Sequence, residues 1–588
     1  MIKNKNVEAM LKNQAVGLMI QQLGPAANTD FGMNLQSFVV ESMVPTERAT
    51  KQSEIFEKSM VKTRAMSKEF RKNTRAKAFP TYDAVSKANP EMRKAVLDVG
   101  SITNFAQING GQSLGYVSLD TELARGTVRP KSFTLYQALD KTAAFQVVDY
   151  WAYTSSTGGP APGGAFNYTG NVATGTLPTS AGQYELNYIT LKLALNGRAI
   201  TIALAAQNSF VDIVGQENTN AALSVMESIN WANYWGNPTL YSYQFEGIYQ
   251  TVLANAPNNI FDFQEFYNGD GSANGWSYEQ TLFNMIYDAA AQVTAYRQYG
   301  QITHAFMTPN TAAGLQSLVT TLLNNVVNNL TPNQIRADGI VINGDLQGMK
   351  TRFGDIQFPV DLFISVRDIP VQAIDLAYNA TDPNAINLAS MYPASVSAVA
   401  STVAAAGSDW TAKYAPSGNS YMYAAAGCDS SMNESTLVYS ASVTGVIAGG
   451  DVTVTITPSS SNAAVAFRVF RSGLGYTAGT PAPAQFRYIG DVAANGTSAV
   501  TFVDLNTHIP GSETVFLLDM DEQDNAIDYR FLLPLSRIEL FAQNLYMPWA
   551  VATIGAIRVR IPKFHSIIKN ITLTSLGFNP LSSNNPNV

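Results

Sequence analysis

About 35 consecutive residues, 150–184, contain no charged side chain. Their middle, as in Ser155–Gly164, is rich in Gly, Pro, Ser and Thr, a composition that predicts neither a helix nor a packed core. Alternating apolar and polar residues return at Tyr184–Ala194 and predict a strand. Loops of this length within a compact domain are usually functional or disordered. Phe166, Tyr168 and the flanking strand favour an extended hairpin laid on another surface over a flexible linker.

The overall composition suits a segment that lies against a neighbour. Only 14% of the 588 residues are charged, whereas about a quarter is usual for a soluble protein. Much of the surface must therefore consist of small or polar uncharged side chains, which cost little to desolvate. A charge buried between subunits, by contrast, costs several kcal/mol unless it is paired. The length predicts three or four domains at about 100–200 residues each.

The inventory of reactive side chains is small. Cys428 is the only cysteine, which excludes a disulfide framework within the chain and any multi-cysteine metal site. There are three histidines, and no P-loop, G-x-S-x-G or H-E-x-x-H motif occurs. We therefore expect neither an enzyme nor a cofactor. No apolar stretch has the length of a signal peptide or a membrane span, so we expect synthesis in the cytosol and no membrane partner.

Charge is distributed unevenly along the chain. Residues 1–100 carry 16 Lys and Arg against 10 Asp and Glu, a net charge of +6, and residues 101–588 carry −13. Within 48–94 the basic residues are interrupted by few large apolar side chains, a pattern that predicts a helix with little core of its own. Two interpretations are open: a solvated charged helix, or an arm attracted to nucleic acid, an acidic scaffold or an acidic neighbouring subunit.

The middle of the chain mixes helix and strand patterns. Helical spacing over Asn218–Asn233 ends at Gly236, which stands where a C′ glycine would stop the helix. A capping box at Ser277–Gln280 opens a second helix. Ile302–Thr308 and Asp355–Ser365 are predicted to be strands. This part of the chain is therefore predicted to be α+β.

Helical patterns disappear at about residue 380, and short alternating runs about ten residues apart take over. This spacing predicts a β-sandwich of immunoglobulin or fibronectin type over residues 381–526. Strand-like sequence returns at Phe531–Leu540 and Ala556–Ile561, so the sandwich is an insertion and not a tail. Its alternating aromatic residues are predicted to lie in the core: Tyr421, Tyr423, Phe467, Phe470, Phe486 and Tyr488.

Short motifs in the middle of the chain occur in a recognisable order. Ala232–Gly236, followed nine residues later by Phe245–Ile248, resembles the end of a spine helix and an F-x-G-L/I turn. Phe306–Asn310 resembles an M-N/T-P start of an axial helix, and Gly354–Phe358 resembles an F-G-x-V-x-V strand. With the basic N-terminal region and the uncharged hairpin before them, they resemble the major capsid proteins of tailed bacteriophages with the Hong Kong 97 fold. The resemblance covers roughly residues 100–375 and 527–572, and the order of the motifs carries it.

This resemblance implies an α+β fold, the Hong Kong 97-like capsid fold, with an inserted all-β sandwich. Its implied parts are an N-terminal arm region that is basic and largely helical (1–134), an extended E-loop hairpin with flanking strands (135–195), a peripheral domain with the spine helix (196–279), an axial domain (280–380), the immunoglobulin- or fibronectin-like insertion (381–526), and return strands with a C-terminal tail (527–588).

The function that the resemblance implies is structural. The chain would self-assemble into hexamers and pentamers of an icosahedral phage head that encloses double-stranded DNA. The implied partners are further copies of the chain, portal, scaffold and decoration proteins, and packaged DNA that is bound on the inner face without sequence preference. The implied location is the capsid of the virion, assembled in the host cytoplasm.

Two arginines are candidate contact residues. Arg558 and Arg560 alternate with apolar residues in a predicted strand. They occupy either a solvated strand face or a face that pairs with another subunit or meets packaged DNA. We take them, together with Phe166 and Tyr168, as candidate inter-subunit contacts.

An acidic run is the one weak candidate for a metal site. Asp519, Asp521 and Asp524 offer oxygen ligands that a hard cation such as calcium prefers. The run lacks the glycine and the final glutamate of an EF-hand loop. A solvated linker that leaves the β insertion is therefore favoured.

Two alternatives to a phage capsid remain. An encapsulin-like shell shares the fold and encloses cargo instead of a genome. A protein of a different class, a surface glycan-binding protein or a hydrolase, could carry a fibronectin-like accessory module. For a capsid protein, we expect the insertion to project from the outer surface, so that deleting residues 393–520 leaves particles that still assemble.

Overall fold

The computed structural model describes residues 130–156, 183–201, 213–266, 278–296, 298–316, 347–371, 391–476, 481–541, 546–572 and 578–581. Most of the predicted N-terminal arm, and Phe166 and Tyr168, lie outside these residues. The chain divides into two units. One comprises Met1–Thr127, Arg198–Asn220 and Glu539–Trp549, and the other comprises Val128–Gly197, Ala221–Ile538 and Ala550–Val588. The surfaces discussed below belong to the second unit.

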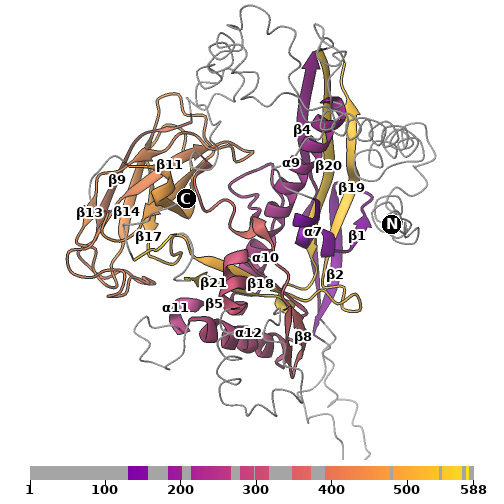
Figure 1. Ribbon diagram of the computed structural model, residues 1–588, viewed down its shortest axis with the longest axis horizontal. Coiled ribbons are helices and arrows are strands. Elements are labelled where there is room, and N and C mark those ends of the chain that lie inside the picture. The colour runs from indigo at the N-terminus through magenta and orange to yellow at the C-terminus, as the bar shows by residue number, and fades with distance from the viewer. Residues whose placement is uncertain are drawn as a thin grey trace, which may run out of the picture. The chain divides into compact units, whose positions relative to one another are not determined.

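A four-stranded sheet joins segments from both ends of the described chain (Figure 1). Its order is β1-β19-β20-β4, with β1 (Lys141–Ala143) parallel to β19 (Ile527–Glu539). The other two strands are β20 (Tyr546–Val559) and β4 (Lys192–Thr201). The strands predicted at Phe531–Leu540 and Ala556–Ile561 are therefore confirmed, although β20 begins ten residues before the predicted strand.

The strand predicted over Tyr184–Ala194 is two strands. β3 (Gln183–Thr190) pairs antiparallel with β2 (Val148–Ser156) as a separate hairpin. The buried Leu191 then interrupts the strand, and its N–H donates to the Val147 carbonyl (2.8 Å). The chain continues as β4 into the four-stranded sheet. The alternation of apolar and polar residues continues across Leu191, so alternation alone cannot reveal this break.

The predicted helix over Asn218–Asn233 is confirmed within α9 (Ile213–Trp235). Its predicted apolar positions are buried. Gly236 follows the helix, but it does not have the left-handed conformation predicted for a C′ glycine. Instead, a Cβ atom at this position would lie 2.2 Å from the Phe245 carbonyl oxygen. The glycine therefore serves close backbone packing.

A six-stranded sheet forms the second layer of the α+β part. Its order is β5-β21-β18-β6-β8-β7. The strands are β5 (Ile260–Asp262), β6 (His304–Phe306), β7 (Gly348–Thr351), β8 (Gly354–Gln357), β18 (Glu513–Leu518) and β21 (Ser566–Ile571). Helix α12 (Tyr278–Thr294) packs its predicted apolar face into the core shared with this sheet. The residue before α12, the predicted capping serine, lies outside the described residues.

Shorter helical elements connect these layers. They are η6 (Pro130–Ser132), α7 (Thr134–Ala138), α10 (Ile248–Asn255), η7 (Pro257–Asn259), α11 (Phe263–Phe266), η8 (Leu362–Ile364), η10 (Pro483–Gln485) and η11 (Pro562–Phe564). The strand predicted over Asp355–Ser365 was too long. β8 ends at Gln357, and the chain forms η8 where the buried Asp361 accepts the Phe363 N–H (2.9 Å).

Residues 391–509 contain a two-sheet β-sandwich. One sheet has the order β12-β11-β15-β16 and the other β17-β14-β9, with a small β10-β13 pair. Apolar residues from both sheets form one core cluster. The strands are β9 (Pro393–Ala400), β10 (Ser420–Tyr421), β11 (Tyr423–Cys428), β12 (Val438–Tyr439), β13 (Val443–Thr444), β14 (Val452–Pro458), β15 (Ala466–Ser472), β16 (Phe486–Ala493) and β17 (Val500–Asp504). Five of the six aromatic residues predicted to lie in the core are buried, and Tyr488 is half-buried.

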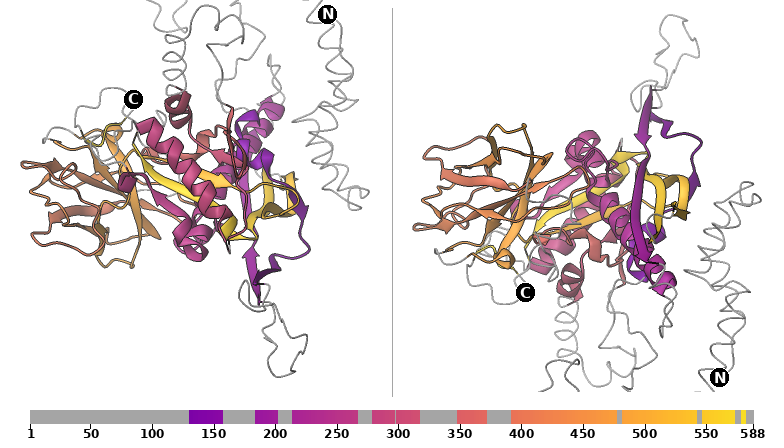
Figure 2. Two further views of the ribbon diagram at one scale, coloured as in Figure 1. Left: turned by 90° about the horizontal axis from the view of Figure 1, so that it is seen from below. Right: turned by 90° about the horizontal axis from the view of Figure 1, so that it is seen from above.

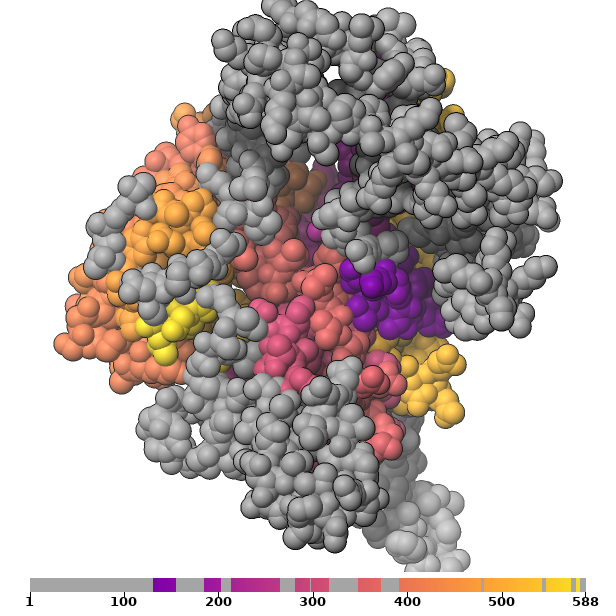
Figure 3. Space-filling model, viewed as in Figure 1, coloured from indigo at the N-terminus to yellow at the C-terminus, as the bar shows by residue number. Residues whose placement is uncertain are grey.

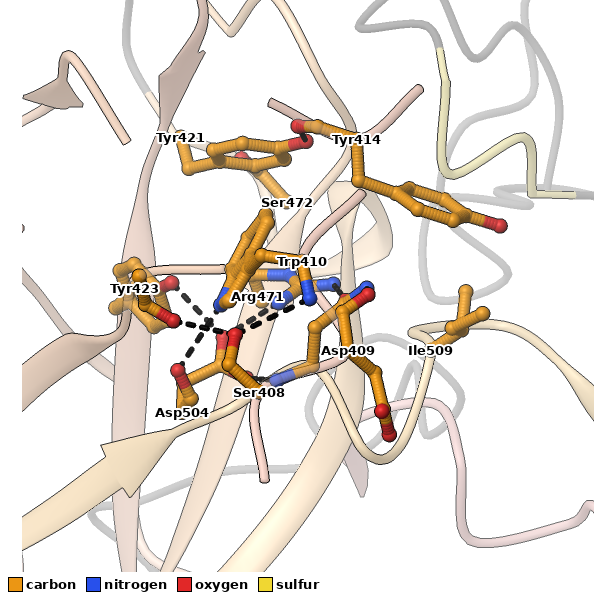
Figure 4. A network of polar contacts seen from close by, with 12 residues as sticks. Ser408, Asp409, Trp410, Tyr414, Tyr421, Tyr423, Arg471, Ser472, Asp504 and Ile509 are labelled. Carbon is orange, nitrogen blue, oxygen red and sulfur yellow. Dashed lines mark hydrogen bonds and ion pairs between the residues drawn. The ribbon is translucent and has the colours of Figure 1, made fainter. Parts of the chain in front are cut away.

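A buried ion pair lies inside the sandwich (Figure 4). Arg471 Nη1 is 2.5 Å from Asp504 Oδ2, and its guanidinium lies over the Trp410 ring, 4.5 Å from the ring centroid. Tyr423 donates its hydroxyl to the same carboxylate (2.9 Å), and Trp410 Nε1 donates to the Asp504 carbonyl (3.0 Å). These aromatic side chains hold a core network and offer no ligand-binding surface.

The sandwich ends earlier than the sequence pattern predicted. β18 lies within residues 381–526, which we expected to belong to the insertion. It pairs instead with β6 and β21 in the centre of the six-stranded sheet. Deleting residues 393–520 would remove this strand, so the deletion proposed from sequence would destroy a central sheet.

Buried polar contacts fasten the sandwich to the α+β part. Glu434, which is buried, lies 3.3 Å from Arg468 Nη1 of the sandwich and 3.5 Å from Arg367 Nη1 of the α+β part. Arg367 Nη2 also donates to the Met432 carbonyl (2.8 Å). Tyr241 packs in one apolar cluster with Met432. The two parts therefore share buried side chains.

Candidate assembly surface

The β2–β3 hairpin extends from the rest of the described ribbon as a two-stranded arm (Figure 2). Its register places Tyr150 opposite Tyr188, Ala152 opposite Leu186, and Thr154 opposite Tyr184. Side chains alternate between the two faces of a strand, so these six residues share one face. We call this face the hairpin face.

The hairpin face is apolar and largely uncovered in the single chain. Tyr184, Leu186, Tyr188 and Tyr150 are 74%, 72%, 65% and 56% exposed. The Tyr150 and Tyr188 rings pack against one another at a centroid distance of 5.9 Å. An isolated two-stranded hairpin is only marginally stable in water and needs a packing partner. A contiguous exposed apolar face of this kind marks an interaction surface.

The opposite face of the hairpin is anchored to the four-stranded sheet. Trp151 donates its indole N–H to the Arg560 carbonyl (3.3 Å), and the Arg558 guanidinium lies 5.7 Å from the Trp151 ring centroid. Tyr153 donates a short hydrogen bond to Glu185 across the two strands. One face of the hairpin is thus held by its own chain, and the other is not.

A cluster of buried charges fixes the base of the hairpin. Asp149 on β2 accepts from Arg530 Nε (2.8 Å) and Arg558 Nη1 (3.1 Å). Arg558 also makes a bidentate pair with Asp528, at 2.7 and 2.5 Å. We call these four residues the root cluster. Arg530 Nη2 also donates to the second Asp149 oxygen (3.4 Å). This two-point pairing sets orientation as well as position, so the root cluster fixes the direction in which the hairpin leaves the sheet.

The root cluster corrects the sequence-based interpretation of Arg558. Its side chain is 4% exposed, and its donors bind carboxylates of its own chain. It is therefore not a solvated residue, and the donors named here are engaged within its own chain. Arg560 is half-buried, and burial together with the neighbouring Arg558 charge lowers its pKa. A contact of Arg560 with another subunit stays a prediction.

The acidic run forms turns at the end of β18. Asp519 is buried, and its carboxylate accepts the Asp521 N–H (3.1 Å) and the Gln301 N–H (3.3 Å). Asp521 in turn accepts the Gln523 N–H (3.0 Å). The prediction of a solvated linker is therefore wrong for Asp519. Within the described part of the chain, no three His, Cys, Asp or Glu side chains, Asp524 included, are grouped to hold a metal ion.

A cavity of about 920 Å³ opens beside α9 and β4. Leu193 and Leu195 of β4, which are half-exposed, line it together with Trp231. Glu227 and Arg367 are among its charged lining residues, and burial raises the pKa of Glu227 although the Arg367 charge opposes this. The lining brings together no nucleophile and base at hydrogen-bond distance in the described residues, so it does not suggest catalysis.

Sequence reasoning identified the hairpin but not the residues of its exposed face. The segment predicted as a strand contains Tyr184, Leu186 and Tyr188. Their alternation was the sequence signal that they share one face. Which side of that strand is covered depends on Arg558 and Asp528, hundreds of residues away in the chain. No helix among the described residues is both long and apolar enough to cross a membrane.

Comparison with known proteins gives no match by sequence: no protein-family model matches the chain, and no curated protein does. Solved structures that resemble it include the following three. The holo-SrpI encapsulin complex from Synechococcus elongatus PCC 7942 is 8% identical and has a TM-score of 0.35, over 80% of this chain and 96% of that chain. The capsid of a native GTA particle is 12% identical (TM-score 0.36; 79% and 99% covered). The capsid of Cyanophage P-SCSP1u is 10% identical (TM-score 0.36; 78% and 93% covered).

Proposed function

We propose that the protein is the repeating subunit of a closed protein shell, the major capsid protein of a tailed phage with a Hong Kong 97-like fold. The observation that carries the proposal is the hairpin face: exposed tyrosines and a leucine on an arm whose base is fixed by buried ion pairs. In a shell, a neighbouring copy would cover this face. The chain then completes its packing only on assembly.

The rigid base of the hairpin supports this proposal. An arm that serves as a linker needs no fixed direction, whereas an arm that must reach the same place on every neighbour does. The root cluster supplies that direction before assembly. Less conformational entropy is therefore lost when the subunits associate. The low charged fraction of the chain, 14%, also favours extended contacts between copies.

The finer parts of the proposal rest on the order of the segments. We propose hexamers and pentamers of an icosahedral head, with the immunoglobulin- or fibronectin-like sandwich as an insertion between axial and return segments. The basic residues of 1–100 suit contact with packaged double-stranded DNA, an acidic scaffold or a neighbouring subunit. Portal and decoration proteins would be further partners, and assembly would take place in the host cytoplasm. An encapsulin-like shell that holds cargo is the second candidate.

Charge placed on the hairpin face tests the proposal. We expect Leu186→Asp and Tyr188→Asp to block assembly, because each subunit contact would then bury an unpaired carboxylate. Neither side chain packs in the core, so the single subunits should keep their circular dichroism and unfolding transition. Leu253→Asp, at a residue of α10 that is 45% exposed, is the matched control and should assemble.

Sedimentation velocity and negative-stain microscopy would measure the outcome. Closed particles from wild type and Leu253→Asp, with only slow-sedimenting folded subunits from the two hairpin variants, would support the proposal. Normal particles from both hairpin variants would contradict it. The contacts that the sequence predicts at Phe166 and Tyr168 can be tested by the same substitution to Asp.

A further inference from the structure

A tight turn joins β16, in one sheet of the sandwich, to β17 in the other. The Ser498 N–H donates to the Asn495 carbonyl (3.0 Å), and these two residues form an antiparallel bridge. Gly496 has a φ of +57°, a conformation that glycine adopts at little steric cost. A glycine at the first central position is typical of type II′ turns. The orange atoms in Figure 3 belong to the sandwich that contains this turn.

The turn contains an Asn–Gly pair that is open to solvent. Asn495 and Gly496 are both exposed. Among the described residues, no hydrogen bond engages the side-chain amide of Asn495 or the backbone N–H of Gly496. The Gly496 carbonyl, by contrast, accepts from Asn462 Nδ2 (2.8 Å). The loop before β15 therefore holds the turn in place, while the Asn495 side chain can rotate in solvent.

This pair has the atoms for an intramolecular substitution. The Gly496 nitrogen, once it has lost its proton, can attack the side-chain carbonyl carbon of Asn495, Cγ. A bond forms between that nitrogen and Cγ, the bond from Cγ to Nδ2 breaks, and the amide nitrogen leaves with a proton as ammonia. The product is a five-membered succinimide ring. Water then opens either ring carbonyl to give aspartate or isoaspartate, so the sequence consumes water and changes no oxidation state. Glycine favours the attack because it has no Cβ to obstruct its nitrogen.

Another Asn–Gly pair of the described residues lies in a different setting. Asn196 and Gly197 belong to β4, which pairs with β20. Asn196 is half-buried, and its Nδ2 donates to Ser224 Oγ on α9 (2.9 Å). The sheet holds the backbone and the hydrogen bond holds the side chain, so the side-chain carbonyl carbon is kept from the Gly197 nitrogen. The same dipeptide is therefore exposed to reaction at one place and protected at the other.

We propose that Asn495 is a site of spontaneous deamidation, in which the Gly496 nitrogen closes a succinimide that water opens to a carboxylate. Each conversion adds one negative charge to a chain whose net charge is −7. Isoaspartate also adds a carbon atom to the backbone where the chain crosses between the two sheets, which lengthens the turn that the Ser498–Asn495 hydrogen bond closes. The sandwich thus acquires an exposed carboxylate with age, whatever the assembly state of the chain.

Peptide mapping of the aged full-length chain tests this site. The purified protein is incubated at pH 6 and at pH 8, and the conversion of amide to acid is followed by mass spectrometry. Trypsin releases Asn196 in the peptide 193–198 and Asn495 in the peptide 488–530, and fragmentation assigns the converted residue in the longer one. Asn196 is the matched control within the same molecule. Digestion in ¹⁸O-labelled water marks any conversion that takes place during the digest itself.

We expect conversion at Asn495 to be several-fold faster than at Asn196 in the folded chain, and faster at pH 8 than at pH 6 because the attacking nitrogen must lose its proton. In urea the two rates should converge, since the difference comes from the fold. Gly496→Asn keeps a residue that tolerates a positive φ but places a side chain beside the attacking nitrogen, and it should slow conversion at Asn495 several-fold. Equal rates at the two sites of the folded chain, or an Asn495 amide that outlasts that of Asn196, would overturn the inference.

Discussion

Arg558 binds two carboxylates that lie far from it along the chain, one 30 and the other 409 positions away. Alternation with apolar neighbours predicted a surface position for Arg558. The period of a strand shows which residues share a face, but it does not show whether another segment covers that face. The base of the β2–β3 hairpin covers the strand face that carries Arg558. The root cluster was therefore not predictable from local sequence, although the strand that carries Arg558 was.

Removing Arg558 tests the root cluster. In Arg558→Met, Asp528 and Asp149 stay buried but lose a cation, and we expect the free energy of unfolding to fall by about 3–5 kcal/mol. Urea unfolding of the unassembled chain would measure it. Lys350→Met is the control, because Lys350 pairs with Asp355 at 3.8 Å and the two side chains are 89% and 71% exposed. Exposed pairs contribute about 0–1 kcal/mol, so equal losses for the two variants would contradict the assignment.

Asp519 gives the stability of the chain a pH dependence. Burial raises the pKa of its carboxyl to about 7, against about 3.9 in an unfolded chain. Between these values the folded chain holds a proton that the unfolded chain has lost, so the contribution of this group to stability falls as the pH rises from about 4 to 7. Burial lowers the pKa of His565 to about 4. The contribution of His565 to stability therefore rises with pH between about 4 and 6.5.

Asp519→Asn isolates this effect because an amide does not ionise. We expect the variant to gain stability relative to wild type as the pH rises from 4.5 to 7, while the contribution of His565 stays common to both proteins. Urea unfolding of the two unassembled chains at several pH values would show the trend. A difference in the free energy of unfolding that does not change with pH would contradict it.

At the scale of elements, two glycines lock the end of α9 to the turn that follows it. The Gly247 N–H donates to the Gly236 carbonyl (2.9 Å). A Cβ atom on Gly236 would lie 2.2 Å from the Phe245 oxygen, and one on Gly247 would lie 2.6 Å from the Gly236 nitrogen. Both neighbours are backbone atoms that cannot swing away. The sequence motif was recognised, but its physical reason is close packing and not a helix cap.

Gly236→Ala should therefore destabilise the chain. We expect a loss of about 1–3 kcal/mol in the free energy of unfolding, the usual effect of overpacking. Gly197→Ala is the matched control, because a Cβ atom there would meet nothing within 4 Å. Thermal unfolding should show a lower midpoint for Gly236→Ala alone. Equal midpoints for the two variants would show that the close approach is relieved at no cost.

Helices and strands with a clear period of apolar residues were predictable from the sequence, but the segments that pair with them were not. The helical period located α9 and α12, and alternation located the strands of the sandwich. The predicted boundary at residue 526 placed β18 in the sandwich, because a short buried strand has the same apolar pattern in either sheet. Its pairing with β6 and β21 depends on residues about 210 positions before it and about 50 after it, beyond the reach of a local pattern.

For the whole molecule, the sandwich and the α+β part share a buried charge cluster around Glu434. We expect a deletion of residues 393–520 to abolish folding, because it removes β18 from the centre of its sheet. A deletion of 393–506 with a flexible Gly/Ser linker retains β18 and should yield a folded chain of lower stability, since Arg367 and Tyr241 lose buried partners. Circular dichroism and solubility of the two deletions would be compared. Equal folding of both would contradict the assignment of β18.

The central claim is that this chain is complete only when copies of it cover one another. The most direct measurement is the assembly state of the purified wild-type protein at increasing concentration, by sedimentation velocity with negative-stain microscopy of the same samples. We predict closed polyhedral particles in equilibrium with, or in excess over, small capsomer-sized species. A stable monomer at high concentration, with the tyrosines of the hairpin face still exposed to solvent, would contradict the account.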